Sequence, residues 1–248
     1  EKKIGINLAS RILTLYEGDT KVKMYHVGVG KTSTPTPTGY YAVQYKEVNP
    51  TWVDPDDTSI QIGSGPDNPI GYRWIGFYGN YGIHGTNHPE SIGGYVSNGC
   101  VRMKEADVED LYQYVSVGTP VTVYYDRLVI DVDPDHTVSY YIYPDGYGWQ
   151  SLSIAQVKKA LAGYGVEDFA DFQEISDKIN ASDGNVTYIA KAYDLVVNGH
   201  KLAKRALGKN GQIYLPSVAV ATALKLDLQW NSQQGILTSP YGIAPGYV

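Results

Sequence analysis

The sequence predicts a mainly β N-terminal half with one short helix, followed by a helical connecting region and a small α+β module. Short apolar runs separated by turn residues fill the first half, which is typical of strands. A helical spacing of apolar residues replaces this alternation after Cys100. An Asn-Gly turn and a further helix mark the last part. We therefore divide the chain into residues 1–128, 129–185 and 186–248.

The N-terminal half opens with hairpins. Apolar residues alternate over residues 4–8, and the runs 12–16 and 22–27 flank a Glu-Gly-Asp turn. Residues 31–39 (KTSTPTPTG) are expected to form a loop, because proline lacks the donor that a sheet ladder needs. A strand is expected over residues 40–45.

A long loop and a helix follow. Residues 49–72 are rich in Pro, Asp, Gly and Ser, and long ordered loops are often functional, so we expect this loop to form one wall of a substrate groove lined by Trp52 and Trp74. Residues 104–114 are predicted to be an amphipathic helix, and residues 120–125 a strand that closes the first domain.

The second half of the chain contains two further patterns. Residues 137–143 predict a strand, and residues 153–161 and 166–179 predict two helices of a connecting module. A hairpin is expected around Asn198-Gly199, then a strand over 211–215 and a helix that starts at Pro216. This last part resembles the copper amine oxidase N-terminal-like domain, an accessory module, although no cluster of His ligands for copper accompanies it.

Composition restricts the partners. The net charge is -6 and the 20 Lys and Arg residues are scattered, so no nucleic acid is expected to bind. No run of about 18 apolar residues predicts a membrane span. No leader segment begins at Glu1, so we expect either a cytosolic protein or one whose signal segment has been removed.

The only cysteine defines a candidate nucleophile. A single Cys excludes an internal disulfide and is by default a small buried apolar residue. A thiol needs a base or a cation to supply thiolate at neutral pH, and His84 lies 100 − 84 = 16 residues before Cys100, far enough for the chain to fold back. Gly99 permits a tight turn beside the thiol. These residue types predict a Cys-His acyl transferase or hydrolase.

A metal site is the alternative for the same segment. His88 and Glu90 lie near His84 in the sequence and could join Cys100 as ligands. Pro89 and the surrounding glycines argue against the helix on which an i, i+4 His pair normally binds metal. We therefore expect no metal and no cofactor, with His88 in a surface loop.

Three segments in the same order resemble the signature of YkuD-type L,D-transpeptidase catalytic domains. They are PTPTGY at residues 35–40, YGIHGT at residues 81–86 and SNGCVR at residues 97–102. The resemblance covers residues 1–126 and implies a YkuD-like β-sandwich. It also implies Cys100 as the nucleophile and His84 as its base.

The resemblance assigns further roles to the neighbouring residues. It implies that the Gly85 carbonyl orients His84, and that backbone N–H groups of Asn98, Gly99 and Cys100 bind the oxyanion. Asn98 stands where the fullest form of the motif has a second His. Arg102 is expected to hold a substrate carboxylate or to organise the loop, and Tyr81 to bind substrate. Ser97 is expected to orient the His or to fix the turn.

The family implies an extracytoplasmic enzyme that cross-links peptidoglycan stem peptides through a cysteine thioester, and so acts in cell-wall biogenesis and cell shape. Stem peptides would be both acyl donor and amine acceptor. Two rival activities at the same site are L,D-carboxypeptidase action and attachment of a protein to the wall. A catalytically inactive wall-binding protein is the alternative from another class.

Overall fold

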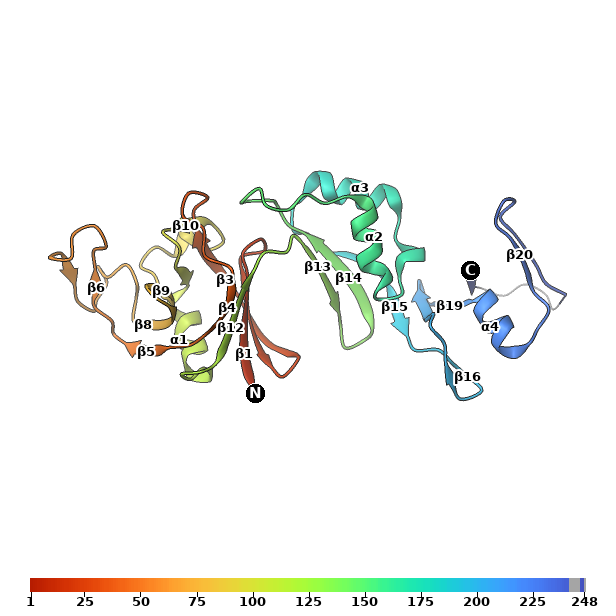
Figure 1. The fold of residues 1–248 in the computed structure, drawn as a ribbon, viewed down its shortest axis with the longest axis horizontal. Coiled ribbons are helices and arrows are strands. Elements are labelled where there is room, and N and C mark those ends of the chain that lie inside the picture. The colour runs from red at the N-terminus through yellow and green to blue at the C-terminus, as the bar shows by residue number, and fades with distance from the viewer. Residues whose placement is uncertain (241–245, 248) are drawn as a thin grey trace. The chain divides into compact units, whose positions relative to one another are not determined.

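The computed structural model describes residues 1–240 and 246–247, and the fold is mostly β (Figure 1). The chain divides into two compact units. The first contains Glu1–Arg127 together with Pro144–Gln150, and the second contains Leu128–Tyr143 together with the residues from Ser151 onward. The sequence-based boundary at residue 128 therefore lies close to the end of the first continuous stretch, but residues 144–150 return to the first unit.

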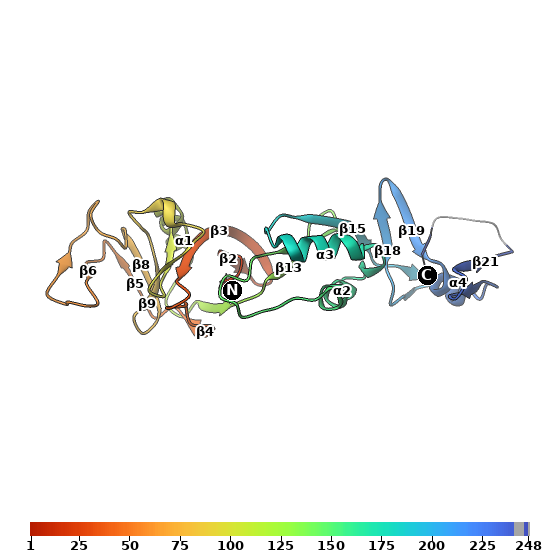
Figure 2. The same ribbon diagram turned by 90° about the horizontal axis from the view of Figure 1, so that it is seen from above.

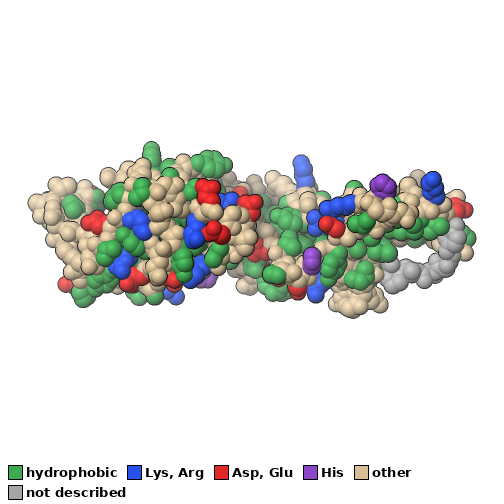
Figure 3. Space-filling model, turned by 90° about the horizontal axis from the view of Figure 1, so that it is seen from below, with side chains coloured by type: hydrophobic (Ala, Val, Ile, Leu, Met, Phe, Trp, Pro, Cys, Tyr) green, Lys and Arg blue, Asp and Glu red, His purple; other side chains and the backbone are tan. Residues whose placement is uncertain are grey.

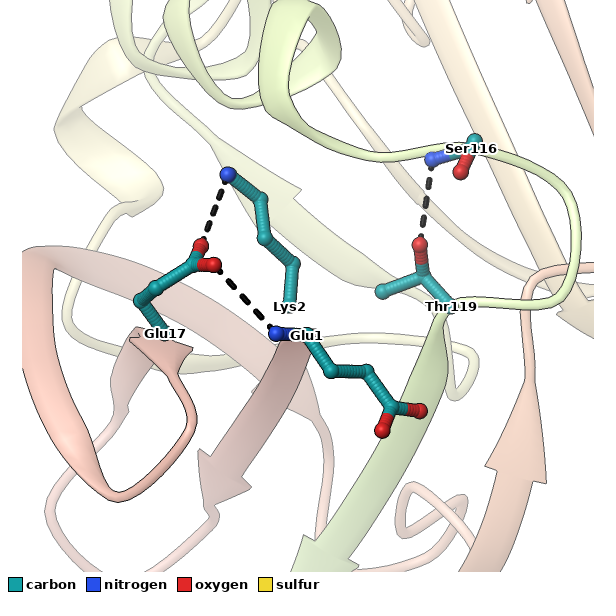
Figure 4. Close-up of polar contacts among 5 residues, drawn as sticks. All are labelled: Glu1, Lys2, Glu17, Ser116 and Thr119. Carbon is teal, nitrogen blue, oxygen red and sulfur yellow. Dashed lines mark hydrogen bonds and ion pairs between the residues drawn. The ribbon is translucent and has the colours of Figure 1, made fainter.

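One half of the first unit's sheet is built from hairpins. Its strands, in spatial order, are β4 (Gly39–Ala42), β12 (Pro120–Tyr124), β1 (Lys2–Asn7), β2 (Ile12–Glu17) and β3 (Thr20–Gly30). The antiparallel pairing of β2 with β3 confirms the expected hairpin, and Gly18 at its turn has a φ of 60°. Lys2 Nζ donates to Glu17 Oε2 at 2.7 Å on paired residues of β1 and β2 (Figure 4).

The other half continues from the end of β3. Its strands are β11 (Val101–Met103), β9 (Tyr81–His84), β8 (Arg73–Tyr78) and β5 (Tyr45–Val48), with β10 (Tyr95–Ser97) paired to β3 beside this path. Because β3 is eleven residues long, it belongs to both halves. β11 runs parallel to β9, which aligns the segment after Cys100 with the segment that ends at His84.

The two faces of β8 and β9 differ. Ile75, Phe77 and Ile83 are buried in the core, where helix α1 (Glu105–Tyr114) contributes Val108 and Leu111. The alternate residues on these strands face away from this core, because successive side chains of a strand point to opposite faces. The core therefore fixes the strands that carry the candidate site, and the helix expected over residues 104–114 is confirmed.

The strand expected over residues 40–45 is wrong in extent. β4 ends at Ala42 and pairs with β12, whereas β5 begins at Tyr45 and pairs with β8. Buried Val43 bridges them, and its N–H donates to the Thr119 carbonyl at 2.9 Å. Thr119 Oγ1 in turn accepts the Ser116 N–H at 3.1 Å (Figure 4). The chain thus passes from one half of the sheet to the other, which alternation of apolar residues cannot reveal.

The loop over residues 49–72 contains a small hairpin of β6 (Trp52–Val53) and β7 (Gln61–Ile62). A fully buried Asn68 holds it together. Its Nδ2 donates to the Pro50 carbonyl at 2.8 Å, and its Oδ1 accepts the Ile70 N–H at 2.9 Å. A short 3-10 helix, η1 (Pro89–Ser91), lies further along the chain.

The second unit has its own core. Its sheet runs β13 (Leu128–Val132), β14 (Thr137–Ile142), β15 (Thr187–Tyr193), β18 (Ala206–Lys209), β19 (Gln212–Pro216) and β22 (Gly246–Tyr247). Helices α2 (Ile154–Ala162) and α3 (Phe172–Ala181) contact each other and bury Val157, Leu161 and Ile175 with the sheet (Figure 2). The sheet continues past residue 185, so it joins the two stretches that we divided there from the sequence.

The helices of this unit begin at polar caps. Ser153 and Gln156 form a reciprocal capping box at the start of α2, as expected for a helix over 153–161. The helix expected over 166–179 starts later, because Asp171 caps α3 and residues 167–169 form a separate 3-10 turn, η2 (Glu167–Phe169). Strands β13 and β15 were not predicted.

The C-terminal elements match several expectations. β16 (Val196–Val197) and β17 (His200–Lys201) form the predicted hairpin, and Asn198 and Gly199 at its turn both have positive φ. Helix α4 (Ser217–Leu224) follows Pro216, and β20 (Gln229–Asn231) pairs with β21 (Ile236–Thr238). None of the helices in the described residues has the length and apolar character needed to cross a bilayer. Acidic and basic side chains are interspersed on the face in Figure 3.

Candidate active site

A cleft of about 760 Å³ opens on the face of β5, β8, β9 and β11 that points away from α1. The loop over residues 49–72 forms part of its wall, and both Trp52 and Trp74 line it, as expected. Six of the residues singled out from the sequence also line this cleft: Tyr81, His84, Ser97, Asn98, Cys100 and Arg102.

His84 is held in one tautomer. The side chain is 4% exposed at the end of β9, and its Nδ1 lies 2.5 Å from the Gly85 carbonyl oxygen. A carbonyl only accepts, so Nδ1 carries the proton and Nε2 keeps a free lone pair. The hydrogen bond that the resemblance implies for Gly85 is therefore present. It leaves the imidazole able to take a proton at Nε2.

The surroundings of His84 favour its neutral form. The Trp74 ring on the neighbouring strand stacks on the imidazole with centroids 5.6 Å apart and planes 7° from parallel. Burial lowers the pKa of His84 to about 4, the Gly85 hydrogen bond opposes this, and the positive charge of Arg102 adds to it. The imidazole is thus uncharged at neutral pH.

Cys100 lies directly before β11 and is partly exposed. The parallel pairing of Val101 with Ile83 and of Arg102 with His84 brings the thiol's strand beside the imidazole's strand. Cys100 Sγ donates to the Asn80 carbonyl at 3.5 Å. Burial raises the pKa of the thiol, while a hydrogen bond with the Gly82 backbone and the Arg102 charge act against this increase. The resting nucleophile is a thiol that needs a base.

Ser97 fixes the turn that carries the nucleophile. Its Oγ donates to the Cys100 carbonyl at 2.6 Å and accepts the Gly99 N–H at 3.1 Å. Of the two roles considered from the sequence, the structure shows the turn-fixing one. The Gly99 N–H already donates to Ser97 Oγ, so of the three expected oxyanion donors only the N–H groups of Asn98 and Cys100 are left.

Gly99 is required by both conformation and space. Its φ is 125°, a region that residues with a Cβ rarely adopt, and an added Cβ would lie 2.4 Å from Cε1 of Tyr81. Tyr81 therefore packs against the nucleophile's turn as well as lining the cleft.

Arg102 supplies the positive charge of the cleft. The guanidinium is half-buried, and burial lowers its pKa from the usual value. Within residues 1–240 and 246–247 it forms neither an ion pair nor a hydrogen bond. An unpaired guanidinium at the wall of a cleft suits a carboxylate of a bound molecule.

A buried carboxyl group beneath the site was not identified from the sequence. Glu105, in the first turn of α1, accepts the Tyr72 N–H at 3.0 Å, and burial raises its pKa. A Cβ on Gly85 would lie 2.1 Å from Glu105 Oε1, so the glycine leaves the space that this carboxyl occupies. An acidic residue at a helix start is common, and only the fold shows what it touches.

His88 lies outside the cleft lining. Its Nδ1 is 3.1 Å from Glu90 Oε1, and both side chains are exposed. Across the described part of the chain, no three His, Cys, Asp or Glu side chains gather as a metal site would require.

The fold and the cleft together define a β domain in which a thiol directly before one strand lies near a neutral imidazole at the end of the adjacent parallel strand. Residues 1–123 match the YkuD family, described as the L,D-transpeptidase catalytic domain. This half of the chain is therefore a YkuD-family L,D-transpeptidase catalytic domain.

Curated relatives match the same half. "Putative L,D-transpeptidase YqjB" of Bacillus subtilis is 46% identical over 112 residues, which are 42% of this chain and 61% of the relative. "Putative L,D-transpeptidase YkuD" of Bacillus licheniformis is 38% identical over 122 residues, 49% of this chain and 64% of the relative. The chain thus spans about three fifths of the length of these two relatives.

Solved structures of L,D-transpeptidases also align with about half of the chain. The catalytic domain from E. faecium, solved by NMR, is 26% identical, with a TM-score of 0.41 over 50% of this chain and 96% of that one. The enzyme from Mycobacterium smegmatis is 20% identical, with a TM-score of 0.43 over 50% and 58% of the two chains.

Proposed function

We propose that this protein is an L,D-transpeptidase that cross-links peptidoglycan stem peptides through a thioester on Cys100. The observation that carries the proposal is the placement of Cys100 directly before β11, which runs parallel to the strand that ends at His84, and the contact of His84 Nδ1 with the Gly85 carbonyl. That contact reserves Nε2 for the thiol proton. Stem peptides are the acyl donor and the amine acceptor.

The first half-reaction forms the acyl-enzyme. The S–H bond of Cys100 turns from the Asn80 carbonyl, and its proton passes to His84 Nε2 as sulfur attacks the carbonyl between the third-position diamino acid and D-Ala. The resting pair is neutral, so proton transfer accompanies attack rather than preceding it. The N–H groups of Asn98 and Cys100 bind the oxyanion.

The second half-reaction transfers the acyl group. When the tetrahedral intermediate collapses, the C–N bond breaks and the D-Ala amine leaves with the proton from His84 Nε2. Arg102 pairs with the D-Ala carboxylate while it is bound. The side-chain amine of a second stem then attacks the thioester, gives a proton to His84, and releases the Cys100 thiol, which takes that proton.

The remaining assignments extend this proposal to the whole chain. An extracytoplasmic location places the enzyme with its substrate, the cell wall. The second unit acts as an accessory module, in which residues 186–248 correspond to the domain that resembles the N-terminal part of copper amine oxidases. The Asn-Gly hairpin at Asn198 and the helix after Pro216 support that resemblance.

A tetrapeptide stem separates the possible activities. Incubation with the protein, followed by mass spectrometry, should give free D-Ala together with a cross-linked dimer. Release of D-Ala without dimer would identify an L,D-carboxypeptidase instead. Failure to release D-Ala at all would favour a wall-binding protein without activity. Cys100→Ala is the matched control and should release nothing.

A further inference from the structure

Four strands place one residue each in a lateral row across the cleft. Glu47 on β5 pairs with Trp74 on β8, Trp74 pairs with His84 on β9, and His84 pairs with Arg102 on β11. Directly paired residues of neighbouring strands project from the same face of a sheet. In agreement, all four residues line the cleft.

The row has opposite charges at its ends. Arg102 is positive, Glu47 is negative, and two uncharged aromatic rings separate them. With neighbouring strands about 4.8 Å apart, three spacings put the backbones of Glu47 and Arg102 about 14 Å apart. The two side chains are therefore too distant to neutralise each other, and the cleft presents a cationic and an anionic end on either side of His84.

Glu47 has no cation of its own among the described residues. The adjacent Lys46 faces the other side of β5, where its Nζ donates to the carbonyls of Tyr112 and Val115 at 2.8 and 2.6 Å. Glu47 itself forms no ion pair or hydrogen bond with any described side chain. Asp54, from the loop that walls the cleft, also lines it, and its Oδ1 accepts the Asp56 N–H at 2.9 Å.

We propose that Glu47 binds a primary ammonium group of the substrate's diamino acid, on the opposite side of His84 from Arg102. The inference rests on the proposed function and deepens it. A stem peptide carries a terminal carboxylate for Arg102 and a side-chain ammonium for Glu47, so the charge order of the row sets the direction in which the peptide lies. A charge-assisted hydrogen bond between ammonium and carboxylate is among the stronger polar contacts in proteins.

The ammonium can come from either of two stems. In the donor it belongs to the residue that carries the scissile carbonyl, and Glu47 then selects the donor. In the acceptor it is the precursor of the incoming nucleophile: Glu47 binds the ammonium, which releases one proton to solvent to become the attacking amine, and His84 takes a second proton during attack. Glu47 recognises an ammonium group in both cases. Thioester formation measures binding of the donor, and dimer formation measures binding of the acceptor.

The test compares Glu47→Gln with Asp67→Asn, an exposed carboxylate of the same loop region that does not line the cleft. Thioester formation is followed against donor concentration, and dimer formation against acceptor concentration. Glu47→Gln should raise KM about tenfold for the donor or for the acceptor, with kcat little changed, and Asp67→Asn should change neither. Circular dichroism verifies that both variants fold.

A substrate without the ammonium group tests whether Glu47 acts through that group. A stem with norleucine in place of the diamino acid serves as the donor or, because it lacks the attacking amine, as a competitive inhibitor of the acceptor, and it should bind wild-type protein about tenfold more weakly than the diamino acid stem. With this stem, Glu47→Gln should cause no additional loss of affinity. Unchanged KM values for both stems in Glu47→Gln, or an equal additional loss with norleucine, would overturn the role of Glu47. No thioester in the wild-type protein would instead overturn the proposed function and this inference with it.

Discussion

Removing the Trp74 ring should raise the pKa of His84. Burial is the largest cause of the low pKa of about 4, against an ordinary value of 6.5, and the stacked Trp74 ring covers one face of the imidazole. The difference corresponds to about 3 kcal/mol in favour of the neutral ring. Trp74→Ala should bring the pKa of His84 most of the way back toward 6.5. Trp74→Phe keeps a smaller ring and should give an intermediate pKa.

The same shift determines how stability depends on pH. The unfolded imidazole takes up its proton near pH 6.5 and the folded one only near pH 4, so the unfolded chain binds more protons between these values. The free energy of unfolding should therefore be highest above pH 6.5 and fall by up to about 3 kcal/mol as the pH drops through 4. Trp74→Ala should show a smaller fall.

The assay is the rate of thioester formation as a function of pH, together with NMR titration of the His84 ring protons. Wild-type kcat/KM should keep its acid limb near pH 4, and the limb should move toward 6.5 in the order wild type, Trp74→Phe, Trp74→Ala. Circular dichroism at each pH restricts the comparison to folded protein. A wild-type limb at 6.5, or an unmoved limb in Trp74→Ala, would refute the reasoning.

Three further substitutions test the supports of the nucleophile's turn. Ser97→Ala removes the hydrogen bonds to Cys100 and Gly99, so it should lower the free energy of unfolding by about 1–3 kcal/mol in urea titration. It should also slow thioester formation, followed by mass. No change in either quantity would contradict the turn-fixing role. Gly99→Ala should cost about 1–3 kcal/mol in urea titration, because φ is 125°, and a neutral effect would argue against that conformation. Tyr147→Phe removes the hydrogen bond from the Tyr147 hydroxyl to the Gly30 carbonyl at 2.5 Å, so it should lower the free energy of unfolding by about 1 kcal/mol in thermal unfolding. An unchanged stability would show that this contact of residues 144–150 does not stabilise the first unit.

The sequence revealed those parts of the fold that depend on local signals. The hairpins at Gly18 and Asn198, the helix α1 and the cap at Ser153 each follow from turn or cap chemistry within a few residues. The order of three motifs identified His84, at the end of β9, and Cys100, directly before β11, and these two strands pair in parallel.

Features that depend on distant contacts were not visible. The return of residues 144–150 to the first unit rests on Tyr147, whose hydroxyl reaches Gly30 and whose ring packs on Tyr95 with centroids 4.9 Å apart. The stacking of Trp74 on His84 arises from strand pairing across a hairpin, and the engagement of the Gly99 N–H by Ser97 depends on a turn geometry. Spacing along a chain does not specify such pairings.

The most direct test of the central claim is the intact mass of the protein after brief incubation with a tetrapeptide stem. We expect the mass to rise by that of the tetrapeptide minus that of the released D-Ala molecule, and peptide mapping to place the addition on Cys100. Cys100→Ala should show no addition under the same conditions. Cross-linked product without an adduct in the wild-type protein, or an adduct at another residue, would contradict the assignment of Cys100 as the nucleophile.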